Sequence, residues 1–534
     1  MMLSSKKKSI AYFNRGIIPW LAVALCTVFL VLVLCNSFLC DDAFITFRYA
    51  SNLADGHGPV FNIGERVEGY TNFLWMIIMT IVIYFGGAPE LWSRIISLVF
   101  SLGTIILFVK HTAIYGARSS TLILFPGFLI FSAPFFIWSS GGLETAAFCF
   151  FAFTGILKLL CDSKQPSGKS FLLSSLYLLA ASLTRPEGII LFVLALMYIV
   201  ILLAQKKIRA KTVLLYFLTY FISYGLYLWW RLSYYGFPLP NSYYVKSPGL
   251  ELLNFGLKYY FLFIVGTFLW IPLLIIIHNL KMKKKNNPDG YSIFLFSVIV
   301  SYSLYVIYTG GDFMGQSRFL MPLLPIIYLF FQRLSGSVKL TDLSNKFKGI
   351  IGFLFIIFVI GNIYIADNSR KISHSGHIDS IGAVIDYTNK WTRVADLIKY
   401  YSLPTDTIAI TSAGIIPYYS NLYTIDILGL IAPDLSKYRP RRGVRRPGHS
   451  VSISPEYFLI LKPHFLIGHP TIVPRNKIKV NSATLEDIEM TIERDYLPVA
   501  VKLPGSGDEI FTFWLRRDTR IRMPKGIMTI ELKD

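Results

Sequence analysis

The sequence is short of charged residues and of cysteine, and each shortage excludes a class of protein. Asp, Glu, Lys and Arg make up only 16% of the 534 residues, whereas soluble domains carry about 25%. The five cysteines include no CxxC pair and have no histidine at metal-ligand spacing, so the sequence indicates neither a disulfide framework nor a zinc site. Apolar residues reach 54%, and the mean hydropathy is +0.53. A soluble globular protein is therefore excluded.

Long apolar stretches take the place of the missing charges. Twelve of them have the length of a membrane span or come close to it, which predicts a polytopic α-helical membrane protein. They lie at 17–39, 71–86, 89–109, 121–138, 143–160, 170–184, 187–204, 212–234, 255–278, 291–309, 319–331 and 348–366. The first stretch is too long for the core of a signal peptide and precedes no A-x-A site, so we expect an uncleaved first span.

Basic loops predict which ends of these spans face the cytoplasm. The loops 205–211, 281–285 and 332–348 each carry four Lys or Arg and lie two spans apart, whereas the segment 41–70 holds five acids against two bases. Because Lys and Arg accumulate in cytoplasmic loops, the segment 41–70 is expected outside. Twelve crossings would return the C-terminal part to the cytoplasm, although the loop charges place it outside. We therefore expect one re-entrant stretch within 71–160 and about eleven transmembrane helices.

The C-terminal third differs in composition from the rest of the chain. Residues 367–534 contain only short apolar stretches, separated by proline, glycine and charged residues. A helical pattern at 381–401, followed by the strand-like TIAIT, predicts a soluble α/β or α+β domain that is long enough to bury its own core. The predicted division is a transmembrane domain, 1–366, with its first extracytoplasmic loop at 40–70, and a periplasmic cap domain made of the residues that follow.

Polar residues suited to chemistry gather on the predicted outer face. Asp41 and Asp42 follow the first span directly, where they either cap a surface helix or act as a base on an acceptor hydroxyl. Acids, bases and one amide from distant parts of the chain share this face. They are Glu68, Glu144, Arg185, Glu187, Asn241, Lys246, Asp312 and Arg318. Arg185 and Glu187 form either a local ion pair or part of a larger cavity. Arg and Lys suit a phosphate and carboxylates suit hydroxyls, so this set predicts a cavity for a phosphate head group with a sugar.

Several segments resemble one known family. They are DDAFITFRYASNLADGHGPVFNIGERVEGYTNFLW from Asp41 onward, SGGLET, LTRPEG, PNSYYVK, GGDFMGQSRFLMPLLP, and SAGIIPYYSNLYTIDILGL with a later Gly448-His449. This pattern is similar to the terminal β-(1→2)-arabinofuranosyltransferases of mycolate-type cell walls and their bacterial relatives, in the GT-C superfamily of polyprenyl-phosphate-sugar-dependent transferases. The resemblance implies a transferase of the bacterial inner membrane, with its active site on the periplasmic face beneath a C-terminal cap.

The resemblance also implies roles for individual residues. Asp41 and Asp42 correspond to the family's catalytic carboxylates, and other residues match polar positions of its cavity by motif. These are Arg48, His57, Glu68, Glu144, Arg185, Lys246, Asp312 and Arg318, and Tyr70, Glu187, Asn241 and His449 complete the expected substrate-binding set.

The expected reaction moves arabinofuranose or a similar sugar from a polyprenyl phosphate to an extracytoplasmic glycan or glycoprotein. No metal or other cofactor is required, because Arg185, Lys246 and Arg318 can offset the phosphate charge, although an acid-rich cavity would also accept a divalent cation. A lipid-linked glycan flippase and an O-antigen-type ligase, which moves a whole glycan, are the alternatives. The basic run 437–450 is expected outside the cell, which disfavours a nucleic-acid partner and leaves an anionic glycan or lipid surface.

Overall fold

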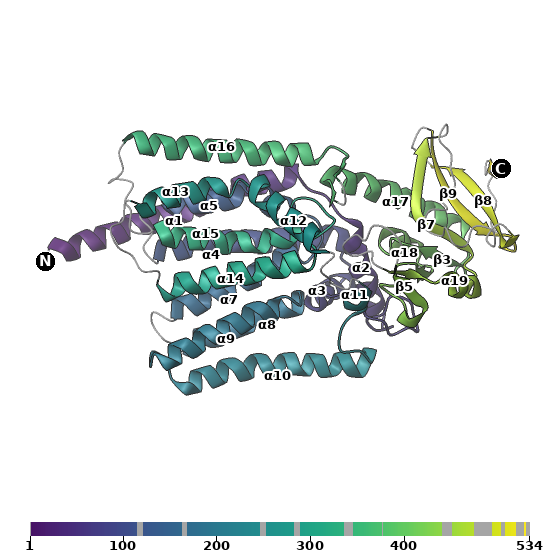
Figure 1. Ribbon diagram of the computed structural model, residues 1–534, viewed down its shortest axis with the longest axis horizontal. Coiled ribbons are helices and arrows are strands. Elements are labelled where there is room, and N and C mark those ends of the chain that lie inside the picture. The colour runs from purple at the N-terminus through teal and green to yellow at the C-terminus, as the bar shows by residue number, and fades with distance from the viewer. Residues whose placement is uncertain are drawn as a thin grey trace.

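The computed structural model divides the chain into a bundle of long helices and a smaller domain at one end of that bundle (Figure 1). The structure describes residues 2–114, 121–162, 168–245, 252–281, 289–335, 345–375, 378–440, 451–474, 494–503, 508–519 and 528–529. The bundle contains the helices up to α16, and the smaller domain, which we call the cap, contains the elements from β1 onward. The N-terminus lies at the end of the bundle that is remote from the cap (Figure 1).

Each of the twelve apolar stretches coincides with a helix or with a broken pair of helices. The bundle contains α1 (Met2–Cys35), α4 (Pro89–Ile114), α5 (Thr121–Phe131), α6 (Ala133–Ile137), α7 (Thr145–Asp162), α8 (Gly168–Thr184), α9 (Gly188–Ala204), α10 (Ala210–Tyr235), α12 (Leu253–Gly266), α13 (Trp270–Lys281), α14 (Gly290–Tyr308), α15 (Leu324–Ser335) and α16 (Asn345–Ser369). Among the described residues, α4, α10, α14 and α16 are each long and apolar enough to cross a membrane, and α12 with α13, bent by 68°, passes the same test as a pair. Shorter apolar helices surround them, so the chain is a multi-pass α-helical membrane protein.

One apolar helix, α3 (Phe73–Tyr84), does not run the length of the bundle. Asn72, directly before it, bonds to Thr46 in α2 (Asp41–Ala54), the short helix that packs beneath the cap. Glu90, just after it, accepts a hydrogen bond from Tyr419 of the cap. Both ends of α3 therefore lie at the cap end of the bundle. Its twelve residues extend about 18 Å, which is less than the roughly 30 Å of a hydrocarbon core.

The cap is built on a six-stranded mixed sheet in the order β10-β8-β9-β7-β3-β4. Its strands are β3 (Thr407–Ile410), β4 (Tyr423–Asp426), β7 (Phe465–Pro474), β8 (Tyr496–Lys502), β9 (Glu509–Arg516) and β10 (Met528–Thr529). Strands β4, β3 and β7 are parallel, and the other pairs are antiparallel. The small elements are β1 (His374–Ser375), β2 (Ile378–Asp379), η4 (Leu435–Lys437), β5 (Tyr438–Pro440), β6 (Val451–Ile453) and α19 (Pro455–Leu461). A parallel half joined to an antiparallel half agrees with the expected α/β or α+β character.

Helix α17 (Ile381–Tyr401) covers the cap sheet and begins where the sequence predicts it. Ser380 caps its first turn by accepting the N–H of Ala383 at 3.1 Å. Buried residues recur at helical spacing along one face, as Val384, Trp391 and Ile398 illustrate. This periodicity explains why the segment folds as an amphipathic helix that packs one face against the cap.

The parallel strands point their carboxyl ends toward the bundle. The chain leaves β3, forms the short helix α18 (Ile415–Ser420) and returns as β4, so it makes a compact β-α-β unit. In Figure 1, α18 lies beside α2, and the structure records direct contacts between the two helices. The carboxyl ends of parallel strands are the edge where open sheets bind ligands. In this fold that edge meets the first loop of the bundle.

Candidate active site

A buried cluster of charged side chains lies at the cap end of the bundle. Arg185 bonds through Nη1 to Glu144 Oε1 at 2.7 Å and through Nε to Glu187 Oε1 at 2.5 Å. Arg185 and Glu187 occupy a three-residue turn between α8 and α9, where Pro186 ends the first helix. Gly188 permits the tight turn, because a Cβ there would lie 2.5 Å from the backbone nitrogen of Ser182. The local sequence RPEG thus points an arginine and a glutamate to the same place.

A second ion pair joins this cluster from the loop between α14 and η2 (Arg318–Leu323). Arg318 Nε bonds to Asp312 Oδ2 at 2.6 Å, and both residues are buried. The connecting loop folds back through positive φ angles at Gly310, Gly311, Gln316 and Ser317. Such φ values are costly for residues other than glycine, so the loop holds a conformation that tertiary contacts must stabilise.

Phe319 brings the two arginines together. The guanidinium of Arg185 lies 4.6 Å from the centre of the Phe319 ring, and that of Arg318 lies 5.0 Å from it. The backbone N–H of Phe319 donates to the Tyr259 hydroxyl at 3.1 Å, which fixes the ring's position. Arg318 uses only Nε on Asp312, and its two terminal nitrogens have no hydrogen-bonding partner among the described residues. These N–H groups remain available to an anion.

Asn72 connects the cluster to the first loop. Its Nδ2 donates to Glu144 Oε2 at 3.0 Å and to the Thr46 hydroxyl at 3.0 Å. Thr46 belongs to α2, the helix that opens with Asp41 and Asp42. One side-chain amide therefore holds the aspartate-bearing helix against the carboxylates of the loops.

The two aspartates occupy different environments. Asp41 is buried, and its Oδ1 accepts the backbone N–H of Ile415, at the start of α18, at 2.7 Å. Burial raises the pKa of Asp41 to about 7, against the lowering effect of the Ile415 N–H. Asp42 is half-buried, and its negative charge raises the pKa of Arg318. Asp41 therefore faces the cap backbone, whereas Asp42 is coupled to the charged cluster.

Burial and opposite charges shift the pKa values of Glu144 and Arg318 in opposite directions. Burial raises the pKa of Glu144, but the guanidiniums of Arg185 and Arg318, together with the hydrogen bond from Asn72, lower it by more, so its pKa is below the usual value. Burial lowers the pKa of Arg318, but Asp312, Asp42 and Glu144 raise it by more, so its pKa is above the usual value. The cluster contains more carboxylates than guanidiniums and is therefore acidic as a whole. In the part of the chain that the structure describes, no three His, Cys, Asp or Glu residues are arranged to hold a metal ion.

Arg48, which is expected to bind substrate, contacts the cap. Its three nitrogens donate to the backbone carbonyls of Phe61 at 2.8 Å, Pro417 at 2.5 Å and Leu422 at 2.7 Å. Pro417 belongs to α18, and Leu422 precedes β4. Each nitrogen of this buried guanidinium thus has a backbone partner, and two of the three partners belong to the cap.

Four other expected residues also lie outside the cluster. Glu68 pairs with Arg231 of α10 at 2.5 Å, and burial raises its pKa to about 7 despite that partner. The Tyr70 hydroxyl bonds to that of Tyr235 at 3.0 Å, and Asn241 Nδ2 donates to the Ala432 carbonyl of the cap at 2.8 Å. The side chain of His57 is exposed in the turn after α2. Glu68, Tyr70 and His57 belong to the first loop, and Asn241 begins the short helix α11 (Asn241–Val245).

Two further expected residues, Lys246 and His449, lie outside the described residues, as does the segment 441–450 of the basic run. The structure also adds residues that the sequence did not single out. Asn72 and Phe319 carry no charge, and Arg231 lies inside an apolar stretch that was assigned as a span. Only its position directly after Arg318 could have indicated that Phe319 contacts the two arginines.

The fold that positions this cluster is similar to that of a solved structure. ArnT from Cupriavidus metallidurans, solved bound to undecaprenyl phosphate, superposes with a TM-score of 0.54 at 11% sequence identity, over 92% of this chain and 97% of ArnT. The expected class of membrane fold is thereby confirmed.

Two curated sequences are similar to this chain, and both are named terminal β-(1→2)-arabinofuranosyltransferase. The one from Mycobacterium tuberculosis is 26% identical over 394 residues, which cover 64% of this chain and 61% of that protein. The one from Corynebacterium glutamicum is 27% identical over 335 residues, which cover 55% of this chain and 47% of that protein. The match thus spans about half to three fifths of these relatives, and the resemblance seen in the motifs is confirmed. A family model described as a domain of unknown function, DUF8728, matches residues 381–514, within the cap.

Proposed function

We propose that this protein transfers arabinofuranose or a similar sugar from a polyprenyl-phosphate donor to an extracytoplasmic glycan or glycoprotein. The observation that carries the proposal is the convergence of Glu144, Arg185, Asp312 and Arg318 next to Asp42, at the end of the bundle that the cap covers. The likeness to two sequences named arabinofuranosyltransferase supports the sugar, and the structure of ArnT with undecaprenyl phosphate supports the lipid carrier.

We further propose a topology of eleven crossings in the bacterial inner membrane, with α3 as the stretch that does not cross. Residues 1–366 would form the transmembrane domain, and residues 367–534 the periplasmic cap. The basic turn Gln205–Lys211 between α9 and α10 lies at the end remote from the cap (Figure 1). Positive loops stay in the cytoplasm, which supports an outward-facing cap and cluster.

In the proposed mechanism, Asp42 is the base and Asp41 positions the cap. Asp41 already accepts the Ile415 N–H, and a Cβ at Gly414 would lie 2.4 Å from its Oδ1, so no acceptor hydroxyl fits between them. Asp42 takes the proton of the acceptor hydroxyl, and that oxygen forms a bond to C1 of the sugar. The bond between C1 and the phosphate oxygen breaks, and its electron pair leaves with the polyprenyl phosphate. The terminal N–H groups of Arg318, for which the described residues provide no acceptor, stabilise the charge that develops there.

We propose that no cofactor takes part in this step. The terminal nitrogens of Arg318 supply positive charge where the phosphate departs, and Arg185 contacts the same Phe319 ring. Because the cluster is acidic as a whole, a bound divalent cation would be tolerated electrostatically, but the mechanism assigns it no role.

Asparagine variants of the two aspartates test this assignment. Purified protein is given polyprenyl-phosphate arabinofuranose and an arabinan acceptor, and kcat is measured. Asp42→Asn removes the base and should lower kcat by roughly 10²–10⁴. Asp41→Asn keeps an oxygen that accepts the Ile415 N–H, so it should retain most of the activity. The opposite ranking would transfer the base to Asp41, and full activity in both variants would remove the assigned base.

A further inference from the structure

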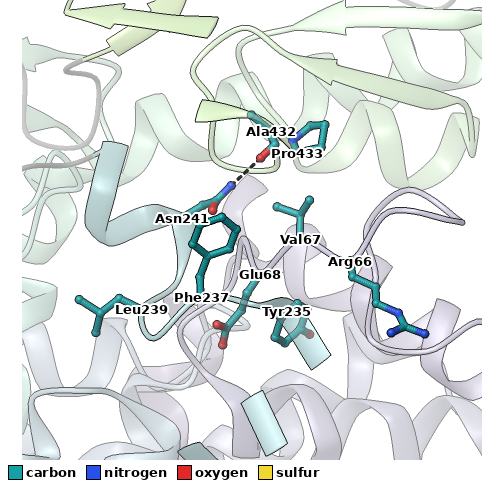
Figure 2. A pocket seen from close by; sticks show the side chains of 9 residues that line it. All are labelled: Arg66, Val67, Glu68, Tyr235, Phe237, Leu239, Asn241, Ala432 and Pro433. Carbon is teal, nitrogen blue, oxygen red and sulfur yellow. Dashed lines mark hydrogen bonds between the residues drawn. The ribbon is translucent and has the colours of Figure 1, made fainter. Parts of the chain in front are cut away.

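Two of the places where the cap contacts the bundle differ in what they hold. At one of them the Asn241 amide donates to the Ala432 carbonyl, beside a cavity of about 20 Å³ (Figure 2). A cavity of that volume has room for about one or two water molecules and not for a phosphate or a sugar ring. At the other, strand β2 lies against the loop between α14 and η2. This loop contains Asp312 and leads directly into Arg318, so its support bears on the charged cluster.

The end of this loop has a backbone conformation that needs support from other parts of the molecule. Gln316 and Ser317 have φ angles of 58° and 46°, in the left-handed region that disfavours residues other than glycine. Both residues directly precede Arg318, so a relaxation of their backbone would turn the guanidinium away from the cluster. Contacts that hold these two residues therefore decide where Arg318 points.

The cap supports the loop from one side through backbone hydrogen bonds. The N–H of Asp379 donates to the Phe313 carbonyl at 2.8 Å, and the N–H of Gly315 donates to the Asp379 carbonyl at 2.8 Å. Glycine fits this contact because a Cβ at position 315 would lie 2.8 Å from the Asp379 carbonyl oxygen. The pairing with β2 ends at Gly315, so it does not reach the two left-handed residues.

Trp138 supports the loop from the bundle side and reaches the next residue. It directly follows α6 and is only 1% exposed. Its Nε1–H is shared between the carbonyls of Gln316 at 3.0 Å and Gly315 at 3.2 Å. The guanidinium of Arg318 lies 5.5 Å from the centre of the Trp138 ring, within the range of a cation–π contact. One indole thus contacts both a left-handed residue and the arginine that follows.

The indole itself is firmly held. Phe38 packs its edge against the Trp138 ring, with 5.2 Å between the ring centres. Gly141 lets the chain approach the other atoms of the ring, because a Cβ there would lie 3.0 Å from Cε3 of Trp138. Every residue of α6 is buried, and the N–H of Ala133 donates to Asn362 Oδ1 of α16 at 2.9 Å. Trp138 therefore offers the loop a donor at a fixed position.

We propose that Trp138 is a positioning residue for Arg318. Its N–H holds the Gln316 carbonyl, so that Ser317 keeps its left-handed conformation and the terminal nitrogens of Arg318 face the departing phosphate. The proposal rests on the proposed function, because it requires Arg318 to act on that phosphate. It adds a residue that carries no charge and acts on the reaction only through Arg318.

A double-mutant cycle on kcat separates this role from a merely structural one. Trp138→Phe removes the N–H and should lower kcat roughly 10–100-fold with little change in KM, because a small displacement of a group that acts on the transition state costs about that much. In the Arg318→Gln background the same change should lower kcat by less than about twofold, because no guanidinium is left to position. Trp75→Phe is the matched control, since it removes an equivalent bond from Nε1 to the Gly142 carbonyl at 3.2 Å. Its effect should be the same in both backgrounds.

Amide hydrogen exchange, measured by mass spectrometry, tests the contact without any transfer reaction. Exchange in the segment 310–321 should be faster in Trp138→Phe than in wild type and unchanged in Trp75→Phe. If Trp138→Phe does not fold, benzothienylalanine at position 138 replaces it in both experiments. This analogue has the shape of tryptophan with a sulfur in place of the N–H, so it removes the donor without leaving a hole.

Three results would overturn the proposal: the same loss of kcat in both backgrounds, no loss of kcat in either, or unchanged exchange in the segment 310–321. The two proposals fail in different ways. Full activity of Arg318→Gln together with faster exchange in Trp138→Phe would reject the proposed function of Arg318, and the positioning role with it. Unchanged exchange together with an inactive Arg318→Gln would reject the positioning role alone.

Discussion

The charged cluster and the contacts that dock the cap use the same kinds of residue in opposite ways. In the cluster, Arg185 and Arg318 pair with side chains, and Arg318 keeps donors that no described residue occupies. In the docking contacts, each of the three nitrogens of Arg48 donates to a backbone carbonyl, and Asp41 accepts a backbone N–H. A motif that places charges side by side therefore does not say which of them does chemistry. The partner of each charge decides that.

The docking contacts also protect an exposed sheet edge. Strand β4 is the last strand of the sheet, and Asn62 of the first loop pairs with Thr424 as a neighbouring strand would. Its Nδ2 donates to the Thr424 carbonyl at 2.9 Å, and its Oδ1 accepts the Thr424 N–H at 3.1 Å. Covered edges prevent unwanted strand pairing. The first loop thus orients the cap and covers its edge.

The largest expected effect is on catalysis by the cluster. Arg318→Gln removes the donors that face the departing phosphate and should lower kcat roughly 10²–10³-fold, with little effect on acceptor KM. Steady-state kinetics with the polyprenyl-phosphate donor measure this. Arg333→Gln, which breaks the ion pair with Asp289 between α14 and α15, is the matched control and should leave kcat unchanged. Comparable losses in both variants would contradict a special role for Arg318.

The next effect is on docking and should appear as lost stability. Arg48→Met keeps much of the apolar length but leaves three buried carbonyls without a donor, which should cost about 3 kcal/mol or more. The thermal midpoint should fall, and limited proteolysis should cut the cap faster. If the variant is as stable as wild type but inactive, Arg48 contacts substrate and the distinction between the two regions fails.

A smaller effect concerns pH and Asp41. Its pKa is raised to about 7 in the folded protein, against about 4 when unfolded, so folding favours the protonated form. As pH rises from about 4 to about 7, the unfolded state ionises first and the folded state loses stability, by at most about 1.4 kcal/mol per pH unit. Asp41→Asn removes this loss. Its stability relative to wild type should therefore increase between pH 5 and pH 7, and a constant difference would contradict the raised pKa.

The smallest expected effect is that of a chelator. Incubation of the purified protein with EDTA should leave transfer unchanged, because the proposed charge stabilisation comes from arginine. Loss of activity that Mg²⁺ or Mn²⁺ restores would show that the acidic excess of the cluster serves a cation.

The sequence predicted the membrane fold, the helical stretches and the change to a cap domain, because apolar runs and composition report these directly. It also placed Glu144, Arg185, Asp312 and Arg318 on one face, since each follows or precedes a span at the same end. It could not predict the cap sheet, whose order depends on strand pairs distant in the chain. The sequence also could not predict that Arg48 contacts the cap. Its three partners are backbone carbonyls, which every residue has, so no pattern of side chains indicates them.

The most direct test of the account supplies purified protein in vesicles with sugar-labelled polyprenyl phosphates, including arabinofuranose, together with a glycan acceptor. We expect that one polyprenyl-phosphate sugar is consumed and that the acceptor gains a single labelled residue on the side that carries the cap. Movement of intact lipid-linked sugar across the membrane without transfer, or addition of a whole glycan from a diphosphate carrier, would contradict it.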